Sequence, residues 1–307
     1  MIALVTDSNA QLPPELARRH RVEVVPLTVT VDGDALLEGV DIDADAFYSR
    51  FATVRPRVST AQPSPGRFAA AYAAVAERGA VVALSIHIGS AVSGTLNSAR
   101  VAARGSAVPI RLVDTGTASF GVACCVWEAA EALVGGASVE EAAVVAEEVG
   151  AAVGNVFVVG GLDLARAGGR LAPGAEVGAG VVAVLSMVGR EMKVVGEAAD
   201  VEGAVEAMAR HVLASGSSLR VGVGMADAAT GPLARALEDR LRRAPEVREV
   251  VRYRIGPSVG AHTGPGTVGA YFYPPPTSRA RSRLTPAAPR GTRTPPARGR
   301  RDRRGGG

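Results

Sequence analysis

The chain has 307 residues, of which 47% are hydrophobic and 21% are charged. This length predicts two hydrophobic cores, and the mixed composition excludes a fibrous protein. The longest apolar run, from Phe68 to Ala76, is far shorter than the roughly 20 residues that cross a bilayer, so we expect no transmembrane helix.

The formal net charge of +4 is divided unevenly along the chain. Residues 274–307 hold ten of the 34 Lys and Arg residues and one of the 30 Asp and Glu residues, which leaves 24 basic and 29 acidic residues in 1–273. Because this tail contains almost no large apolar side chain, we predict that 274–307 is disordered. Its arginines could bind nucleic acid or anionic lipid. No aromatic residues are interleaved for base stacking, so we favour a compositionally biased extension, and we expect no nucleic-acid binding by the body.

The N-terminus and the cysteines indicate a cellular compartment. The opening run Ile2–Val5 has no basic segment before it and meets Asp7 at once, which is typical of a first strand and not of a secretory signal. The only cysteines, Cys124 and Cys125, are adjacent and fit neither a disulfide framework nor a CxxC site. We therefore predict a cytoplasmic protein with two buried thiols.

The first half of the chain alternates short β-rich runs with longer helical patterns. Such alternation predicts a parallel sheet with helices on both faces, forming an N-terminal α/β domain over 1–152. A hairpin inserted at Thr28–Gly33 is predicted from period-2 alternation that ends in Asp-Gly. The predicted strands are 2–5, 22–26, 81–86 and 109–113, and the predicted helices are 68–78, 94–104 and 119–134.

A second set of elements follows the glycine-bounded stretch 150–154, which we take as the domain boundary. It predicts a C-terminal α/β domain with a mixed sheet over 153–273. The predicted strands are 156–159, 192–195, 219–223, 247–253 and 268–273, and the predicted helices are 201–213 and 228–243.

Three loops after predicted strands are rich in hydroxyls and glycines: residues 6–9, 87–95 and 114–119. Ligands of open α/β sheets bind at such carboxyl ends. A Ser or Thr that opens a helix is commonly only an N-cap. Three such loops together predict a seat for an anionic oxygen at helix N-termini.

Two further segments are more specific than capping requires. In 59–66 two prolines predict a rigid loop that orients Thr60, and in 256–266 six glycines and prolines surround His262 in a predicted loop. Competing motifs are incomplete. Gly222-Val223-Gly224 lacks the third glycine of a dinucleotide site, and no nucleophile elbow or HExxH cluster is present, so we predict no cofactor and no metal.

Together these motifs resemble one family, the DegV-type fatty-acid-binding proteins that serve a bacterial fatty acid kinase. The resemblance covers nearly all of 1–273 and is carried by Val5–Ser8, Ser59–Gly66, Ser90–Thr95, Val113–Thr115, Gly168–Leu171 and Gly260–Gly266. It implies a two-domain α/β fold that holds a long-chain fatty acid at the domain junction, with the tail in the C-terminal domain. By position in the motifs, Thr60 and Ser93 would bind the carboxylate, with Arg170, His262 and Thr263 nearby.

The resemblance further implies a lipid-binding carrier and not an enzyme. In the family the bound acid is presented to a separate kinase, which phosphorylates the carboxylate on the route to phospholipid synthesis. This chain departs from the family pattern where a Lys-Pro pair is replaced by Val182-Ala183 and where 196–201 lacks an arginine. These missing cations concern the kinase contact more than lipid binding.

Two alternatives remain open from the sequence. One is a divergent member that binds another hydrophobic carboxylate or acts as a regulatory module. The other is a small-molecule hydrolase with Ser93 as nucleophile and His262 as base, which requires the two side chains to lie within hydrogen-bond reach.

Overall fold

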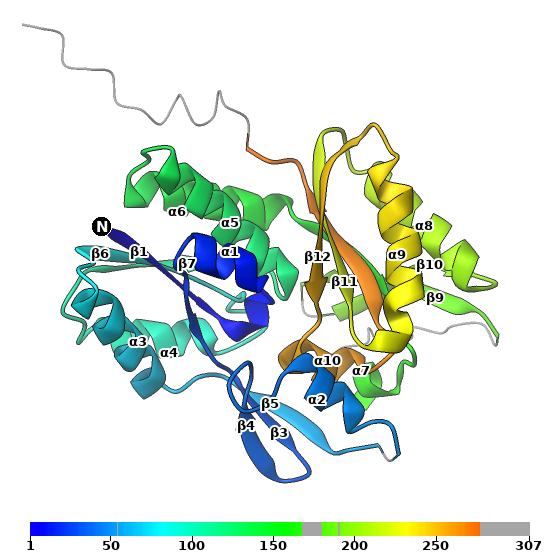
Figure 1. Ribbon diagram of the computed structural model, residues 1–307, viewed down its shortest axis with the longest axis horizontal. Coiled ribbons are helices and arrows are strands. Elements are labelled where there is room, and N and C mark those ends of the chain that lie inside the picture. The colour runs from blue at the N-terminus through cyan, green and yellow to red at the C-terminus, as the bar shows by residue number, and fades with distance from the viewer. Residues whose placement is uncertain (54, 168–179, 190, 277–307) are drawn as a thin grey trace, which may run out of the picture.

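The computed structural model describes residues 1–53, 55–167, 180–189 and 191–276 (Figure 1). Arg170 and its motif Gly168–Leu171 lie outside the described residues, as does the part of the predicted disordered tail from 277 onward. Across the described residues, no helix is long and apolar enough to cross a membrane.

The N-terminal sheet has four parallel strands in the order β2-β1-β6-β7. Consecutive residues of β1 face opposite sides, as the pleat requires: Ala3 and Val5 enter the core beneath α3 and α4, while Leu4 enters the core beneath α5. Figure 1 shows helices on both faces, which confirms the predicted arrangement. The elements are β1 (Ile2–Asp7), η1 (Ser8–Ala10), α1 (Pro14–Arg19), β2 (Glu23–Val25), α3 (Pro65–Glu77), β6 (Val82–His87), α4 (Thr95–Ala103), β7 (Ile110–Asp114), α5 (Phe120–Val134) and α6 (Val139–Ala152).

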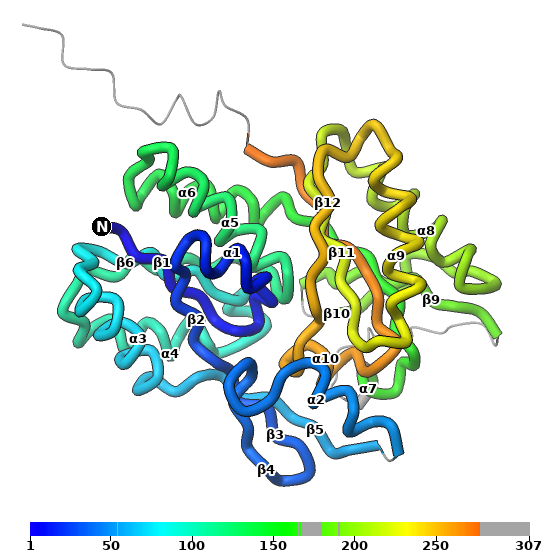
Figure 2. Tube along the Cα trace, in the orientation of Figure 1, coloured from blue at the N-terminus to red at the C-terminus, as the bar shows by residue number. Residues whose placement is uncertain are grey.

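A small antiparallel sheet, in the order β4-β3-β5, is inserted between β2 and α3. The predicted hairpin is confirmed, with Asp32 and Gly33 both at positive φ, as a tight two-residue turn requires. In Figure 2 this insertion projects from the N-terminal layer and lies beside α10. Its elements are β3 (Thr28–Val31), β4 (Asp34–Leu37), α2 (Ala44–Ser49) and β5 (Val58–Ala61).

The second sheet is mixed and has six strands in the order β10-β9-β8-β13-β11-β12, with only β11 and β12 parallel. Helices α8 and α9 cover one face over a core that includes Met208 and Leu237 (Figure 1). The elements are β8 (Gly154–Val158), α7 (Asp163–Ala167), β9 (Val182–Val188), β10 (Glu191–Ala198), α8 (Val201–Leu213), β11 (Leu219–Met225), η2 (Ala228–Thr230), α9 (Gly231–Arg242), β12 (Val247–Arg254), α10 (Pro257–Thr263) and β13 (Val268–Tyr273). The sequence patterns predict none of α7, β9 and α10.

Helix α5 packs against the other face of this sheet and joins the two layers. The ring of Phe120 lies over Gly222 of β11, where any Cβ would collide with it, and stacks on Tyr253 at 4.3 Å between ring centroids. The predicted buried thiols are confirmed, because Cys124 and Cys125 are fully buried and unbridged in α5.

A buried ion pair lies at the same junction. Glu128 of α5 is fully buried and contacts the guanidinium of Arg220 on β11, and Tyr273 donates a hydrogen bond of 3.1 Å to the same carboxylate. The guanidinium also lies 4.6 Å from the ring centroid of Trp127, a cation–π contact. Side chains of both layers therefore meet here: Glu128 and Trp127 from α5, and Arg220 and Tyr273 from the six-stranded sheet.

Replacing Arg220 with Met should lower the free energy of unfolding by about 3–5 kcal/mol, because the change removes one charge from a desolvated pair. Urea denaturation measures the loss. The matched control is Arg240→Met, which breaks the exposed 3.2 Å pair with Glu206 and should cost about 1 kcal/mol or less. Equal losses in the two variants would contradict a role for Arg220 at the junction.

Candidate functional site

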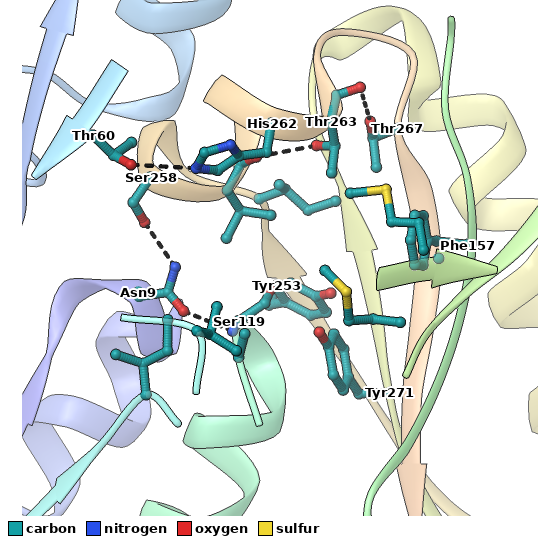
Figure 3. A pocket seen from close by; sticks show the side chains of 18 of the residues that line it. Asn9, Thr60, Ser119, Phe157, Tyr253, Ser258, His262, Thr263, Thr267 and Tyr271 are labelled. Atoms are coloured by element: carbon teal, nitrogen blue, oxygen red, sulfur yellow. Dashed lines mark hydrogen bonds between the residues drawn. The ribbon is translucent and has the colours of Figure 1, made fainter. Parts of the chain in front are cut away.

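A pocket lies between the carboxyl ends of β1, β6 and β7 and the face of the six-stranded sheet that packs on α5 (Figure 3). Polar side chains concentrate on the wall formed by the N-terminal layer, the insertion and α10. Apolar side chains come from the six-stranded sheet. The lining residues used below are Asn9, Thr60, Val92, Ser93, Ser119, Val156, Phe157, Met187, Met192, Tyr253, Ser258, His262, Thr263, Ala270 and Tyr271.

The three predicted strand-end loops do converge, and three of their hydroxyls, those of Thr6, Ser90 and Thr115, bond to a neighbouring strand or loop. Thr6 donates to the Ile86 carbonyl at 2.8 Å, and Thr115 donates to the His87 carbonyl at 2.8 Å. Of the polar side chains in these loops, Asn9, Ser93 and Ser119 line the pocket. In the first loop Asp7 caps η1, while the N-cap residues of α4 and α5, Gly94 and Ser119, make no side-chain capping bond. The capping interpretation therefore does not account for these loops as a whole.

A fully buried contact between Asp7 and His87 holds the carboxyl ends of β1 and β6 together. Asp7 Oδ2 lies 2.9 Å from His87 Nδ1 and accepts a bond from the Ile88 amide at 3.1 Å, and neither side chain is exposed. His87 Nε2 lies 2.6 Å from the Ser85 hydroxyl, which in turn lies 3.0 Å from the Tyr72 hydroxyl. The chain leaves β1 for β2 on one side and reaches β6 on the other, so this pair marks the switch point at which α/β sheets bind ligands.

Thr60 and His262 meet in the lining of the pocket, with 3.2 Å between Thr60 Oγ1 and His262 Nε2. The predictions of a loop at Thr60 and of a loop at His262 are both wrong. Thr60 lies on strand β5, and His262 lies in the last turn of helix α10. Pro257 at the first turn favours the helix, and Gly260 lets α2 approach, because a Cβ there would meet the Tyr48 side chain. A strand and a helix, and not proline-rich loops, therefore orient these two side chains.

Ser93 lies in the loop before α4, and its hydroxyl is 2.8 Å from the Thr95 hydroxyl. It also accepts a bond from the Thr95 amide at 3.3 Å, so it partly caps the helix while lining the pocket. These contacts give Ser93 a threonine partner, and the 3.2 Å contact of His262 Nε2 is with Thr60. They do not form the serine–histidine pair that the hydrolase alternative requires.

Thr263 lines the pocket beside His262 and donates to the Val259 carbonyl at 3.3 Å. Asn9 connects this helix to α5. Its amide donates to Ser258 Oγ at 3.2 Å, and its side-chain oxygen accepts from the Ser119 amide at 2.8 Å (Figure 3). One asparagine therefore sets the distance between the start of α10 and the start of α5.

Glu38, at the end of the insertion's hairpin, is buried against the start of α10. Its carboxylate accepts from the Ser258 amide at 2.9 Å and from the Ser8 hydroxyl at 2.5 Å. Burial raises the pKa of Glu38 above its ordinary value, and the bonds from Ser8 and Ser258 only partly offset that effect. This residue joins the first loop, the insertion and α10, and no motif in the sequence pointed to it.

A family model described as "Uncharacterised protein, DegV family" matches residues 1–275. This chain belongs to the DegV family. A DegV domain-containing protein of Streptomyces coelicolor is 37% identical over 274 residues, covering 87% of this chain and 96% of the relative. Another, from Deinococcus radiodurans, is 32% identical over 278 residues, covering 89% and 98%.

Solved structures of DegV proteins share the fold. A DegV family protein of Thermus thermophilus, whose structure is described for its fatty acid binding, superposes with a TM-score of 0.79 at 30% identity, covering 89% of this chain and 99% of that one. A DegV lipid-binding protein of Thermotoga maritima gives a TM-score of 0.76 at 27% identity, covering 89% and 98%. The predicted family and two-domain α/β fold are thereby confirmed.

The structure brings together four of the five site residues predicted from the DegV motifs, namely Thr60, Ser93, His262 and Thr263. Arg170, the fifth, lies outside the described residues. Sequence reasoning missed Ser258, Tyr253 and Tyr271 as lining residues. The sequence carries no signal for the two tyrosines, because their place beside the glycine-rich strand β11 depends on the strand order of the sheet.

Glu38→Gln should change the pH dependence of folding. A carboxyl whose folded pKa is raised contributes most stability below its unfolded pKa, here near 4.5, and loses that contribution as the pH rises through the folded value. The melting temperature of the wild type, relative to that of Glu38→Gln, should therefore fall as the pH increases from 4 to 8. The control is Glu148→Gln at an exposed position. A constant difference between wild type and Glu38→Gln over this range would disprove the assignment.

Proposed function

We propose that this DegV-family chain binds a long-chain fatty acid in the pocket, with its carboxylate at Thr60 and Ser93 and with His262 and Thr263 beside it. The supporting observation is the mixed lining, which combines the hydroxyls of Thr60 and Ser93 and the imidazole of His262 with apolar side chains of the six-stranded sheet, namely Phe157, Met187 and Met192. The fatty acid binding described for the Thermus thermophilus relative agrees with this assignment.

The energetics divide between the two ends of such a ligand. A tail of roughly 14 methylenes contributes on the order of 10 kcal/mol at about 0.8 kcal/mol per buried methylene, before association costs are subtracted. The tail would therefore supply most of the affinity. The carboxylate would supply orientation, because a buried anion needs donors, and the hydroxyls of Thr60 and Ser93 can donate to it.

We further propose that the chain is a cytoplasmic carrier and not an enzyme, with the N-terminal domain over 1–152 and the C-terminal, tail-binding domain over 153–273. It would present the carboxylate to a separate fatty acid kinase for acyl-phosphate formation. The exposure of the residues at the carboxylate end supports this role, because Thr60, Ser93 and His262 are each only partly buried. Incubation with a kinase subunit and ATP, followed by trapping of the acyl phosphate with hydroxylamine, tests the kinase step independently of binding.

Native mass spectrometry of the recombinant protein, followed by solvent extraction, tests the binding itself. We expect one fatty acid per chain. A protein that stays empty after incubation with a panel of saturated and unsaturated acids would overturn the proposal.

Ser93→Ala should weaken fatty acid binding by roughly fivefold to a hundredfold, because a lost hydrogen bond to a charged group costs about 1–3 kcal/mol. Titration of delipidated protein measures the dissociation constant. Ser64→Ala is the matched control, since Ser64 caps α3 at 3.4 Å and does not line the pocket. It should lower thermal stability without changing affinity. If Ser93→Ala behaved like Ser64→Ala, Ser93 would be only a cap.

A further inference from the structure

Two glycines of β11 have a role that the fatty acid site does not explain. Gly222 and Gly224 stand in a Gly-Val-Gly sequence, and a Cβ at either position would collide with an aromatic ring. At Gly222 the ring is Phe120. At Gly224 it is Tyr253, and the collision includes the phenol hydroxyl. Tyr253 belongs to β12, and its ring therefore extends across the adjacent strand β11, with the hydroxyl above Gly224.

This placement directs Tyr253 toward Tyr271. In the sheet register Tyr253 of β12 pairs with Gly224, and Tyr271 of β13 pairs with Gly222, so the tyrosines approach from opposite sides of a strand that has no side chains at these two positions. Figure 3 shows both hydroxyls directed to the same part of the pocket. Ser119 lines the same pocket and lies beside Tyr253 in Figure 3, and its hydroxyl partly offsets the rise that burial causes in the pKa of both phenols.

The three hydroxyls form a polar cluster within an otherwise apolar region of the pocket. Tyr253 is 5% exposed and Ser119 is 4% exposed, and both side chains line the pocket with Tyr271. Phe157 and Met187 are among the apolar residues that share this lining. Burial raises the pKa of both phenols, so each remains a neutral donor at physiological pH.

An unbroken alkyl chain does not match this cluster. Three hydroxyls carry three donors and more acceptor sites than they can satisfy among themselves. A methylene segment packed against them would displace water and return no hydrogen bond, which is unfavourable for buried polar atoms. A ligand oxygen at this depth would satisfy them.

We propose that Ser119, Tyr253 and Tyr271 form a subsite for a second oxygen, a hydroxyl or keto group, carried on the acyl chain of the bound acid. This inference rests on the proposed fatty acid binding and narrows its ligand to oxygenated fatty acids. The carboxylate end of the pocket keeps the role assigned above. The pocket would discriminate against an unsubstituted fatty acid because its alkyl chain offers no hydrogen bond to the three hydroxyls.

The test compares stearic acid with a series of hydroxystearic acids that differ in the position of the hydroxyl, each titrated into delipidated full-length protein. The wild type should bind the best-matched isomer roughly tenfold more tightly than stearic acid, the amount expected from one or two hydrogen bonds. The double variant Tyr253→Phe/Tyr271→Phe keeps both rings and should lose this preference while binding stearic acid at least as well. Tyr273→Phe is the control, because Tyr273 lies on the same strand but outside the pocket.

The outcomes separate this inference from the proposed function. Tight binding of stearic acid with no isomer preferred overturns the subsite and leaves fatty acid binding intact. A preference that persists in the double variant also overturns it. If neither stearic acid nor any hydroxystearic acid binds, the proposed function fails and the subsite fails with it. Melting temperatures of the variants confirm that each is folded.

Discussion

The site depends on the buried pair of Asp7 and His87 at the carboxyl ends of β1 and β6. Both side chains are fully buried, and a buried charge is tolerated only where partners surround it. The Asp7 carboxylate is hydrogen-bonded to the His87 imidazole and accepts bonds from the amides of Ile88 and Asn9. These bonds fix the paths of the loops that follow β1 and β6. One of these loops carries Asn9 and the other carries Ser93. Asp7 and His87 do not line the pocket, but they position the loops that form one of its walls.

The second constraint is that no single segment contains the site. Thr60 and His262 are 202 positions apart and meet because the insertion docks on α10, where Glu38 receives the Ser258 amide. The apolar wall belongs to the six-stranded sheet, which α5 connects to the N-terminal layer. A ligand in this pocket would contact all three parts, and its binding energy would add to the stability of their association.

The sequence predicted the structure best where a local pattern of residues is enough to determine a single helix or turn. Helical patterns located α3, α5 and α8, and the Asp-Gly turn located the hairpin. It was least informative where tertiary contacts decide the result. The α10 segment is rich in glycine and proline, and it is helical because Gly260 lets Tyr48 approach and Glu38 receives the amide of Ser258. The convergence of Tyr253 and Tyr271 depends on a register across β11 that no local pattern encodes.

The contact between Arg220 and Trp127 has a practical consequence. Trp127 is the only tryptophan of the chain, and it is 6% exposed with a guanidinium over its ring at the junction of the two layers. Indole emission responds to nearby charge and to solvent, so the protein carries a single intrinsic fluorophore placed where its two halves meet. Opening or tightening of that junction can therefore be followed optically, in the unlabelled protein, as a candidate ligand is titrated.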